Sequence, residues 1–140
     1  MKQGHAFTLL ELMIVIAILM ILGMITVPRV QEALVSARES AAQQEVHNLY
    51  TAQAQYLSQY GRYAVSLTEL GPGAGAAGLI AEDLAAGNKS GYHYEIQATV
   101  QGYRLSATPL NYPVSGRVTF TCDQTGVLRQ ARPVSGAAKN

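Results

Sequence analysis

The feature that most constrains this 140-residue chain is an uninterrupted apolar run from Phe7 to Val27. About twenty such residues, in a helix, cross the hydrocarbon core of a bilayer. The run contains one ionisable side chain, Glu11, near its start, and no cation before Arg29. A carboxylate at membrane depth costs about 2.5–3.5 kcal/mol unless it finds a partner. The sequence therefore indicates a partner outside this segment, which points to assembly with another chain.

Two simpler interpretations explain the run less well. A secretory signal peptide would have a shorter apolar region that ends in a small-residue cleavage site. Here the run continues instead into Pro28, Arg29 and a polar segment. An uncleaved membrane anchor explains the length of the run but leaves Glu11 unexplained.

The sequence Gly-His-Ala-Phe-Thr-Leu-Leu-Glu at residues 4–11, together with the apolar run and Pro28, resembles the N-terminus of type IV pilins and type II secretion pseudopilins. In that family a prepilin peptidase cuts just before the Phe and methylates the new N-terminus. The resemblance implies a leader of residues 1–6, a cleavage site between Ala6 and Phe7, and N-methylation of Phe7. It also implies that Glu11, Thr8 and Pro28 serve assembly.

The residue before the cut departs from the family pattern, because Ala6 stands where the family strongly prefers Gly. A small residue still fits a narrow protease subsite, so processing is expected, at an equal or lower rate. Cleavage after Gly4 is the alternative. It would leave two residues ahead of Phe7 and shift Glu11 out of register.

The resemblance also implies a partner for the buried carboxylate. Cleavage creates a cationic amine on Phe7, and Glu11 of one subunit can neutralise the Phe7 amine of a neighbour. At about 4 Å and an effective dielectric near 20, such a pair attracts by roughly 4 kcal/mol. Desolvation offsets much of this attraction. The pair is therefore expected to fix the position of one subunit along its neighbour, while the apolar surfaces of their helices pack against one another.

Beyond Pro28 the apolar residues keep a helical period as far as Tyr60. The pattern predicts an amphipathic helix that continues the apolar one, with a kink or loosened turn at Pro28 and a stop at Gly61. The predicted sheet-facing stripe consists of Val30, Leu34, Ala37, Ala41, Val46, Leu49, Gln53, Tyr56 and Tyr60.

Residues 61–91 predict an irregular, glycine-rich connector with short helical turns at 66–70, capped by Ser66, and at 80–86. From Tyr92 the apolar period changes to two, which predicts an antiparallel sheet of three or four strands with one apolar face. That face is expected to carry Tyr92, Tyr94, Ile96, Ala98, Tyr103, Leu105, Ala107, Val118, Phe120 and Cys122. The turns are expected at Gln101-Gly102 and at residues 123–126. The predicted fold class is α+β: a long N-terminal helix, transmembrane over residues 7–28 and amphipathic beyond, packs on a small C-terminal antiparallel sheet. This is the type IV pilin fold, and residues 29–140 form its head.

Composition narrows the function classes. A formal charge of +1 gives no global basic field, so no specific nucleic-acid partner is inferred. Cys122 is the single cysteine, which excludes an intramolecular disulfide. This absence slightly favours a pseudopilin or a minimal pilin over a major pilin with a disulfide. His47, His93 and Asp123 lack metal-ligand or catalytic spacing. No cofactor, metal or enzymatic activity is expected.

The leading hypothesis is a structural subunit of a type IV pilus, polymerised through its N-terminal helix. Its implied partners are identical or related pilin subunits in a helical homopolymer, the prepilin peptidase, an inner-membrane assembly platform, and the lipid bilayer before assembly. It would cross the inner membrane once before assembly and lie in a cell-surface or periplasmic filament afterwards. The alternatives are a type II secretion pseudopilin and a membrane-anchored binding module that never polymerises.

Overall fold

The computed structural model describes residue 4 and residues 6–132. Most of the predicted leader, residues 1–3 and 5, lies outside the described residues, as do residues 133–140. Contacts divide the chain between Leu34 and Val35 into an N-terminal unit and a C-terminal head. Helix α1 (Leu9–Tyr60) contributes residues to both units.

Helix α1 is continuous through Pro28 and ends where the sequence predicts. Gly61 follows the last helical residue with φ = 71°, in the left-handed region that glycine adopts without steric cost. Its amide donates to the carbonyl of Leu57 at 2.8 Å, which satisfies one of the free carbonyls at the helix end. The predicted stop at Gly61 is therefore confirmed.

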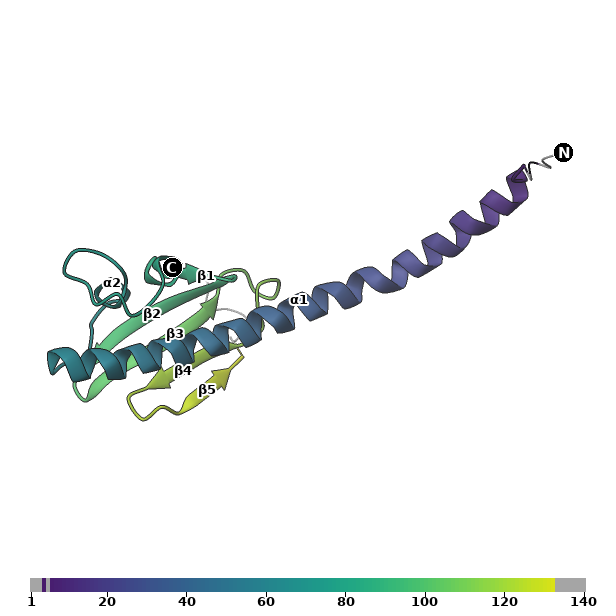
Figure 1. Cartoon of the computed structure of the whole chain (residues 1–140). Helices are drawn as coiled ribbons and strands as arrows, with labels where there is room; N and C mark the ends of the chain where they lie inside the picture. Colours follow the sequence, from purple (N-terminus) through teal and green to yellow (C-terminus); the bar gives the residue numbers. More distant parts are fainter. Residues whose placement is uncertain (1–3, 5, 133–140) are drawn as a thin grey trace. The chain divides into compact units, whose positions relative to one another are not determined.

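The head contains a five-stranded antiparallel sheet in which sequential strands are neighbours, in the order β1-β2-β3-β4-β5 (Figure 1). The prediction of three or four strands was one short. The additional strand is β1, whose two residues pair with the start of β2 and are too few to show a period of two. The bounds are β1 (Asn88–Lys89), β2 (Tyr92–Thr99), β3 (Gly102–Pro109), β4 (Thr119–Asp123) and β5 (Leu128–Ala131).

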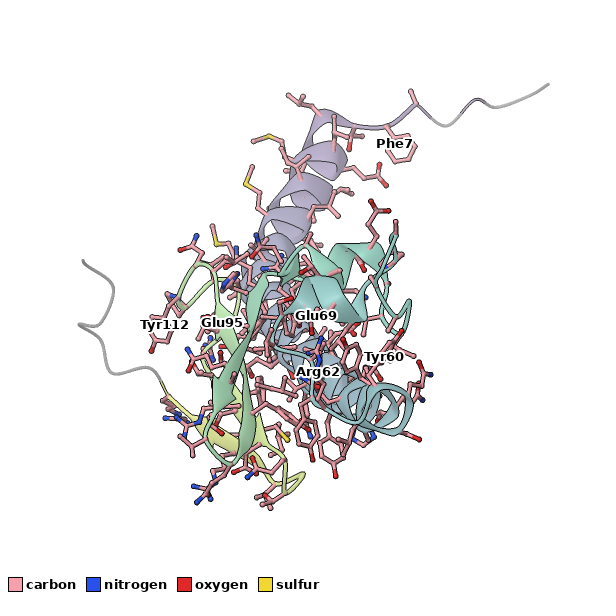
Figure 2. All side chains as sticks on the ribbon, turned by 90° about the vertical axis from the view of Figure 1, so that its left-hand side faces the viewer. Phe7, Tyr60, Arg62, Glu69, Glu95 and Tyr112 are labelled. Carbon is pink, nitrogen blue, oxygen red and sulfur yellow. The ribbon has the colours of Figure 1, made fainter. Side chains whose placement is uncertain are left out.

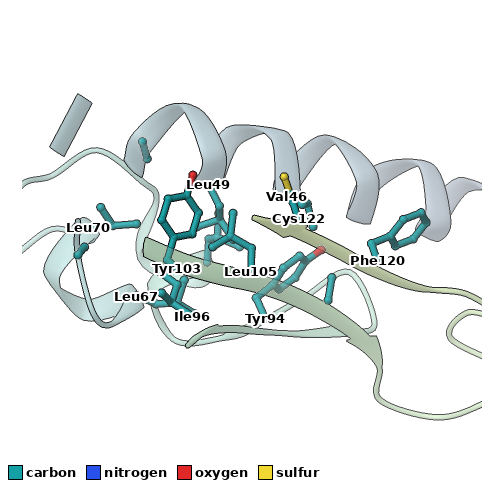
Figure 3. Close-up of a cluster of buried hydrophobic side chains, with 14 of the residues drawn as sticks. Val46, Leu49, Leu67, Leu70, Tyr94, Ile96, Tyr103, Leu105, Phe120 and Cys122 are labelled. Carbon is teal, nitrogen blue, oxygen red and sulfur yellow. The ribbon is translucent and has the colours of Figure 1, made fainter. Parts of the chain in front are cut away.

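The hydrophobic core lies between the C-terminal part of α1 and one face of this sheet (Figure 3). The predicted alternation is confirmed: Tyr94, Leu105 and Phe120 are each at most 2% exposed and point towards the helix. Strands β2, β3 and β4 therefore each have one face in the core and one face outside, as is usual for antiparallel sheets. The α+β prediction, a long N-terminal helix on a small antiparallel sheet, is confirmed.

The predicted stripe on α1 is correct only in its middle. Val46, Leu49, Gln53 and Tyr56 are buried, and the first buried residue of α1 is Val35. The buried face extends N-terminally from Val46 through Ala42 to Val35, at intervals of four and seven residues. The stripe was therefore wrong at Val30, Leu34, Ala37 and Tyr60, which are exposed, and Ala41 is half-buried.

The connector after α1 is held near its start by side-chain hydrogen bonds. The Ser66 hydroxyl accepts from the amide of Glu69, which caps α2 (Leu67–Leu70) as predicted. Glu69 also receives two hydrogen bonds from the Arg62 guanidinium, at 3.1 and 3.4 Å, which lower the pKa of its carboxyl (Figure 2). The second predicted turn is the short helix α3 (Glu82–Ala85).

Gln53 is the one fully buried polar side chain of α1, and it clamps the connector to the helix. Its amide nitrogen donates to the Ala64 carbonyl, and its amide oxygen accepts from the Ala64 amide, both at 2.9 Å. This pair of bonds satisfies both backbone groups of Ala64 in the core. Gln53 stands within an apolar stripe because the connector passes back along the helix and places Ala64 next to it. The sequence alone did not show this contact.

Replacing Gln53 with leucine should lower the free energy of unfolding by about 1–3 kcal/mol, because both buried backbone groups of Ala64 would lose their partners. Urea denaturation of a soluble protein that starts at Arg29 measures this change. Gln55→Leu is the matched control, since Gln55 is exposed on the same helix. Equal stability of the two variants would contradict the clamp.

Candidate assembly segment

The N-terminus of α1 is capped by the side chain of Thr8. The Thr8 hydroxyl accepts from the Glu11 amide at 3.2 Å, and the Thr8 carbonyl accepts from the Leu12 amide at 3.2 Å. Thr followed three residues later by Glu, ahead of an apolar run, is the sequence signature of this cap. The signature is present at residues 8–11 and was overlooked in the sequence reasoning.

The cap gives Glu11 a local role in the single subunit. A carboxylate in the first turn of a helix is stabilised by the helix dipole by about 0.3–1 kcal/mol, and Glu11 is the acidic residue of that turn in α1. This amount is smaller than the cost of about 2.5–3.5 kcal/mol for a charge at membrane depth. The cap therefore explains part of why a carboxylate stands here, and the remainder still requires a partner.

No ion pair among the described residues involves Glu11. The carboxylate lies on the exposed surface of the helix, and Phe7, just before the helix, is 79% exposed. Of the predicted site residues, Phe7, Thr8 and Glu11 lie together at the start of α1, whereas Pro28 lies far along the same helix. The segment therefore presents an acid, and in a processed chain an amine, at one end.

The apolar run is exposed throughout the part of the chain that the structure describes. Every large apolar side chain from Phe7 to Val27 is between 45% and 79% exposed. Helix α1 is long and apolar enough to cross a membrane. Soluble monomeric proteins rarely leave an apolar surface of this extent in water. Lipid or other protein must therefore cover it.

In the last turns of the run, the Thr26 side chain has a hydrogen-bond partner, whereas one backbone carbonyl lacks its usual one. The Thr26 hydroxyl donates to the Leu22 carbonyl at 2.8 Å, so this side chain needs no outside partner. Pro28 has no amide to donate, which deprives the Met24 carbonyl of its usual helical bond. Gly23 adds a residue of low helix propensity. The backbone is therefore least supported just before Pro28, where the prediction placed a loosened turn, although the helix remains continuous.

The polar side chains of the head serve the fold. Asp123 accepts hydrogen bonds from the amide and the hydroxyl of Thr125, which hold the β4–β5 turn and lower the pKa of its carboxyl. Nδ1 of His93 lies 2.7 Å from the Asn88 side-chain oxygen. Cys122 is buried as predicted, and burial raises the pKa of its thiol. Within residues 6–132, no cluster of three or more potential metal ligands was found.

Comparison with known proteins agrees with this geometry. Residues 1–27 match the family described as the prokaryotic N-terminal methylation motif. The chain is also 38% identical over 69 residues to the type IV major pilin protein PilA of Myxococcus xanthus (strain DK1622). That match covers 49% of this chain and 31% of the relative, so it spans about a third of the relative's length. No solved structure matches the chain.

These findings confirm the predicted resemblance to the type IV pilin and pseudopilin family. The methylation motif over residues 1–27 and a helix long and apolar enough to cross a membrane agree with this resemblance. The pseudopilins remain a related option within the same family.

Proposed function

We propose that this chain is the structural subunit of a type IV pilus filament, processed by a prepilin peptidase and polymerised through its N-terminal helix. The observation that carries the proposal is the apolar segment of α1, which is exposed along its whole length and starts at a Thr8 cap beside Glu11, within an N-terminal methylation motif. The relative that is a type IV major pilin adds support for a pilus over a pseudopilus.

In this proposal the chain has three functional parts. Residues 1–6 are the leader, residues 7–28 are the transmembrane and assembly helix, and residues 29–140 are the head. The helix crosses the inner membrane once and then leaves the bilayer for the filament core. The partners are identical or related subunits, the peptidase and an inner-membrane assembly platform, and the filament lies at the cell surface or in the periplasm.

Glu11 and Phe7 have the central roles in assembly. The cut after Ala6 leaves a cationic, N-methylated amine on Phe7, and Glu11 of the incoming subunit pairs with the amine of its neighbour. The bond from the Glu11 amide to the Thr8 hydroxyl holds the Glu11 backbone at a fixed place at the start of the helix. Electron microscopy of surface fibres, in cells with and without this chain, tests the proposal. Fibres that persist without the chain would contradict it.

Processing should be visible by mass spectrometry. The mature protein in purified filaments should begin at a methylated Phe7, because residues 1–27 carry the methylation motif. Ala6→Gly should leave the cutting rate unchanged or raise it, whereas Ala6→Phe should block cutting by filling the narrow subsite. Filament protein that still carries Met1 would contradict the assigned cleavage site.

A further inference from the structure

The outer face of the sheet carries a small hollow between two arginines. Arg104 lies on β3 and Arg129 on β5, with Thr121 and Asp123 on β4 between them. Arg104 is paired directly with Asp123, and Arg129 is paired directly with Thr121. The Cβ atoms of side chains at such positions are about 4.5–5.5 Å apart. The strand register therefore places the two arginines on either side of β4, around one hollow.

The two arginines lack a carboxylate partner from the chain itself. No ion pair within the described part of the chain involves Arg104 or Arg129. All nine acidic residues belong to that part, since residues 1–3, 5 and 133–140 contain no Asp or Glu. Glu95, another carboxylate on the outer face, accepts from the Gln97 side-chain amide at 3.3 Å. Both guanidinium groups are therefore available to an anion from outside the chain.

The strands around the hollow also carry an excess of positive charge. Residues 102–132 contain four arginines and one acid, Asp123, whereas the formal charge of the whole chain is +1. The other acids all precede Gly102 in the sequence. A local excess of one sign attracts ions of the opposite sign, over a distance that salt limits to about 10 Å at 0.1 M. These strands therefore favour an anionic ligand although the chain as a whole is nearly neutral.

Asp123 restricts the kind of anion that fits. The hydrogen bonds from Thr125, followed by the nearby charges of Arg129 and Arg104, lower the pKa of the Asp123 carboxyl, so it is ionised at neutral pH. This charge repels an anion that has no hydrogen-bond donor. Both Thr125 bonds end on Oδ1 of Asp123, which leaves Oδ2 to accept from a ligand. A ligand with a carboxylate and hydroxyl groups would therefore satisfy the arginines and Asp123 together.

The size and lining of the hollow suit a single ring. Its volume is about 160 Å³, and one water molecule needs about 10–15 Å³ of such space. The hollow therefore admits a small cyclic molecule. Val127 forms part of the wall and is 53% exposed, so it offers an apolar contact to the C–H groups of a ring. The Thr121 hydroxyl adds a group that can donate or accept.

We propose that this hollow binds a hexuronate, with the sugar carboxylate on Arg104 and Arg129 and a ring hydroxyl donating to Asp123. Guanidinium groups hold carboxylates through paired, charge-assisted hydrogen bonds, which are stronger than bonds between neutral groups. The inference goes beyond the proposed filament subunit. It uses residues of the head alone, so it stands or falls independently of polymerisation.

Saturation-transfer NMR on the full-length chain in nonionic detergent micelles tests the site, with glucuronate as the probe. Glucuronate should give a clear signal, whereas glucose, which has no carboxylate, and acetate, which has no hydroxyl, should give signals at least three-fold weaker. Arg104→Gln and Arg129→Gln should each reduce the glucuronate signal at least three-fold. Arg117→Gln removes the same charge at an exposed arginine outside the hollow and should leave the signal unchanged.

Replacing Asp123 tests the preference for a hydroxylated ligand. Asp123→Asn removes the negative charge from the hollow, so it should raise the acetate signal relative to that of glucuronate. Suppression of the glucuronate signal by oligogalacturonate would support a polysaccharide as the source of the ligand, and suppression by galacturonate alone would support the free sugar. A glucuronate signal no stronger than that from empty micelles, or an equal signal from the unaltered chain and both arginine variants of the hollow, would overturn the inference.

Discussion

Cells whose only copy of this chain carries Glu11→Gln should make no filaments and should keep the subunit in the membrane. The substitution removes the one charge of the apolar run, so insertion becomes easier. It also removes the partner that we propose for the Phe7 amine of the neighbouring subunit. Counting fibres by electron microscopy, alongside immunoblots of the membrane fraction, measures the two effects separately.

Glutamine is the informative replacement because it separates the charge from the cap. The cap uses the backbone amide of residue 11, which Gln keeps, so Glu11→Gln preserves the start of α1. Thr8→Ala does the reverse, since it removes the hydroxyl that accepts from the Glu11 amide and keeps the carboxylate. We expect Thr8→Ala to cost about 0.5–2 kcal/mol of local helix stability and to retain fibres.

Glu32→Gln is the matched control for the loss of charge. Glu32 is the next carboxylate along α1, lies beyond the apolar run and is exposed. It should not affect fibre formation. Normal fibre counts from Glu11→Gln would mean that the carboxylate acts through the local cap alone, and the proposed pairing with Phe7 would have to be abandoned.

Sequence periodicity predicted the head well where packing acts over many residues. The alternation in β2 and β3 placed Tyr94, Ile96, Tyr103 and Leu105 in the core, and they are buried there. It failed at Ala98, which is exposed near the end of β2. The first turn was also displaced by one residue, because Gly102 pairs with Thr99 as the first residue of β3. Periodicity reports which face is buried but does not fix where pairing begins.

The helix shows the same limit more strongly. An apolar residue on α1 can face the sheet, lipid or another subunit, and the 3.6-residue period does not distinguish between these surroundings. Val30 and Leu34 were therefore assigned to the sheet, although the head begins to cover the helix only at Val35. The Gln53–Ala64 bonds were not predictable, because they depend on where the connector returns to the helix.

Part of the candidate site was also predicted from the sequence, and part was not. The resemblance to a known motif supplied Phe7 and Glu11, and the comparison over residues 1–27 agrees with that motif. The hydrogen bond from the Glu11 amide to the Thr8 hydroxyl was missed, although Thr followed three residues later by Glu is a recognisable pattern at the start of a helix.

Replacing Phe120 with alanine should destabilise the head by roughly 3–5 kcal/mol, the usual cost of removing a buried aromatic ring. Phe120 is 2% exposed, lies opposite Ala107 across the β3–β4 pair, and has its ring centroid 6.0 Å from that of Tyr92. The small Ala107 side chain cannot fill the space that the ring leaves. Because domains of this size are stable by about 5–15 kcal/mol, this one change removes a large share of the total.

The measurement is urea denaturation of a protein that starts at Arg29, which lacks the apolar run and keeps the residues of the head. It should be soluble, monomeric and cooperatively folded, because its core lies between α1 beyond Val35 and the sheet. Thr108→Ala on the exposed face of β3 is the control and should cost less than about 1 kcal/mol. Adding residues 7–28 back should restore polymerisation without altering this stability. If the truncated protein were unfolded, or formed filaments by itself, assembly could no longer be assigned to the N-terminal helix.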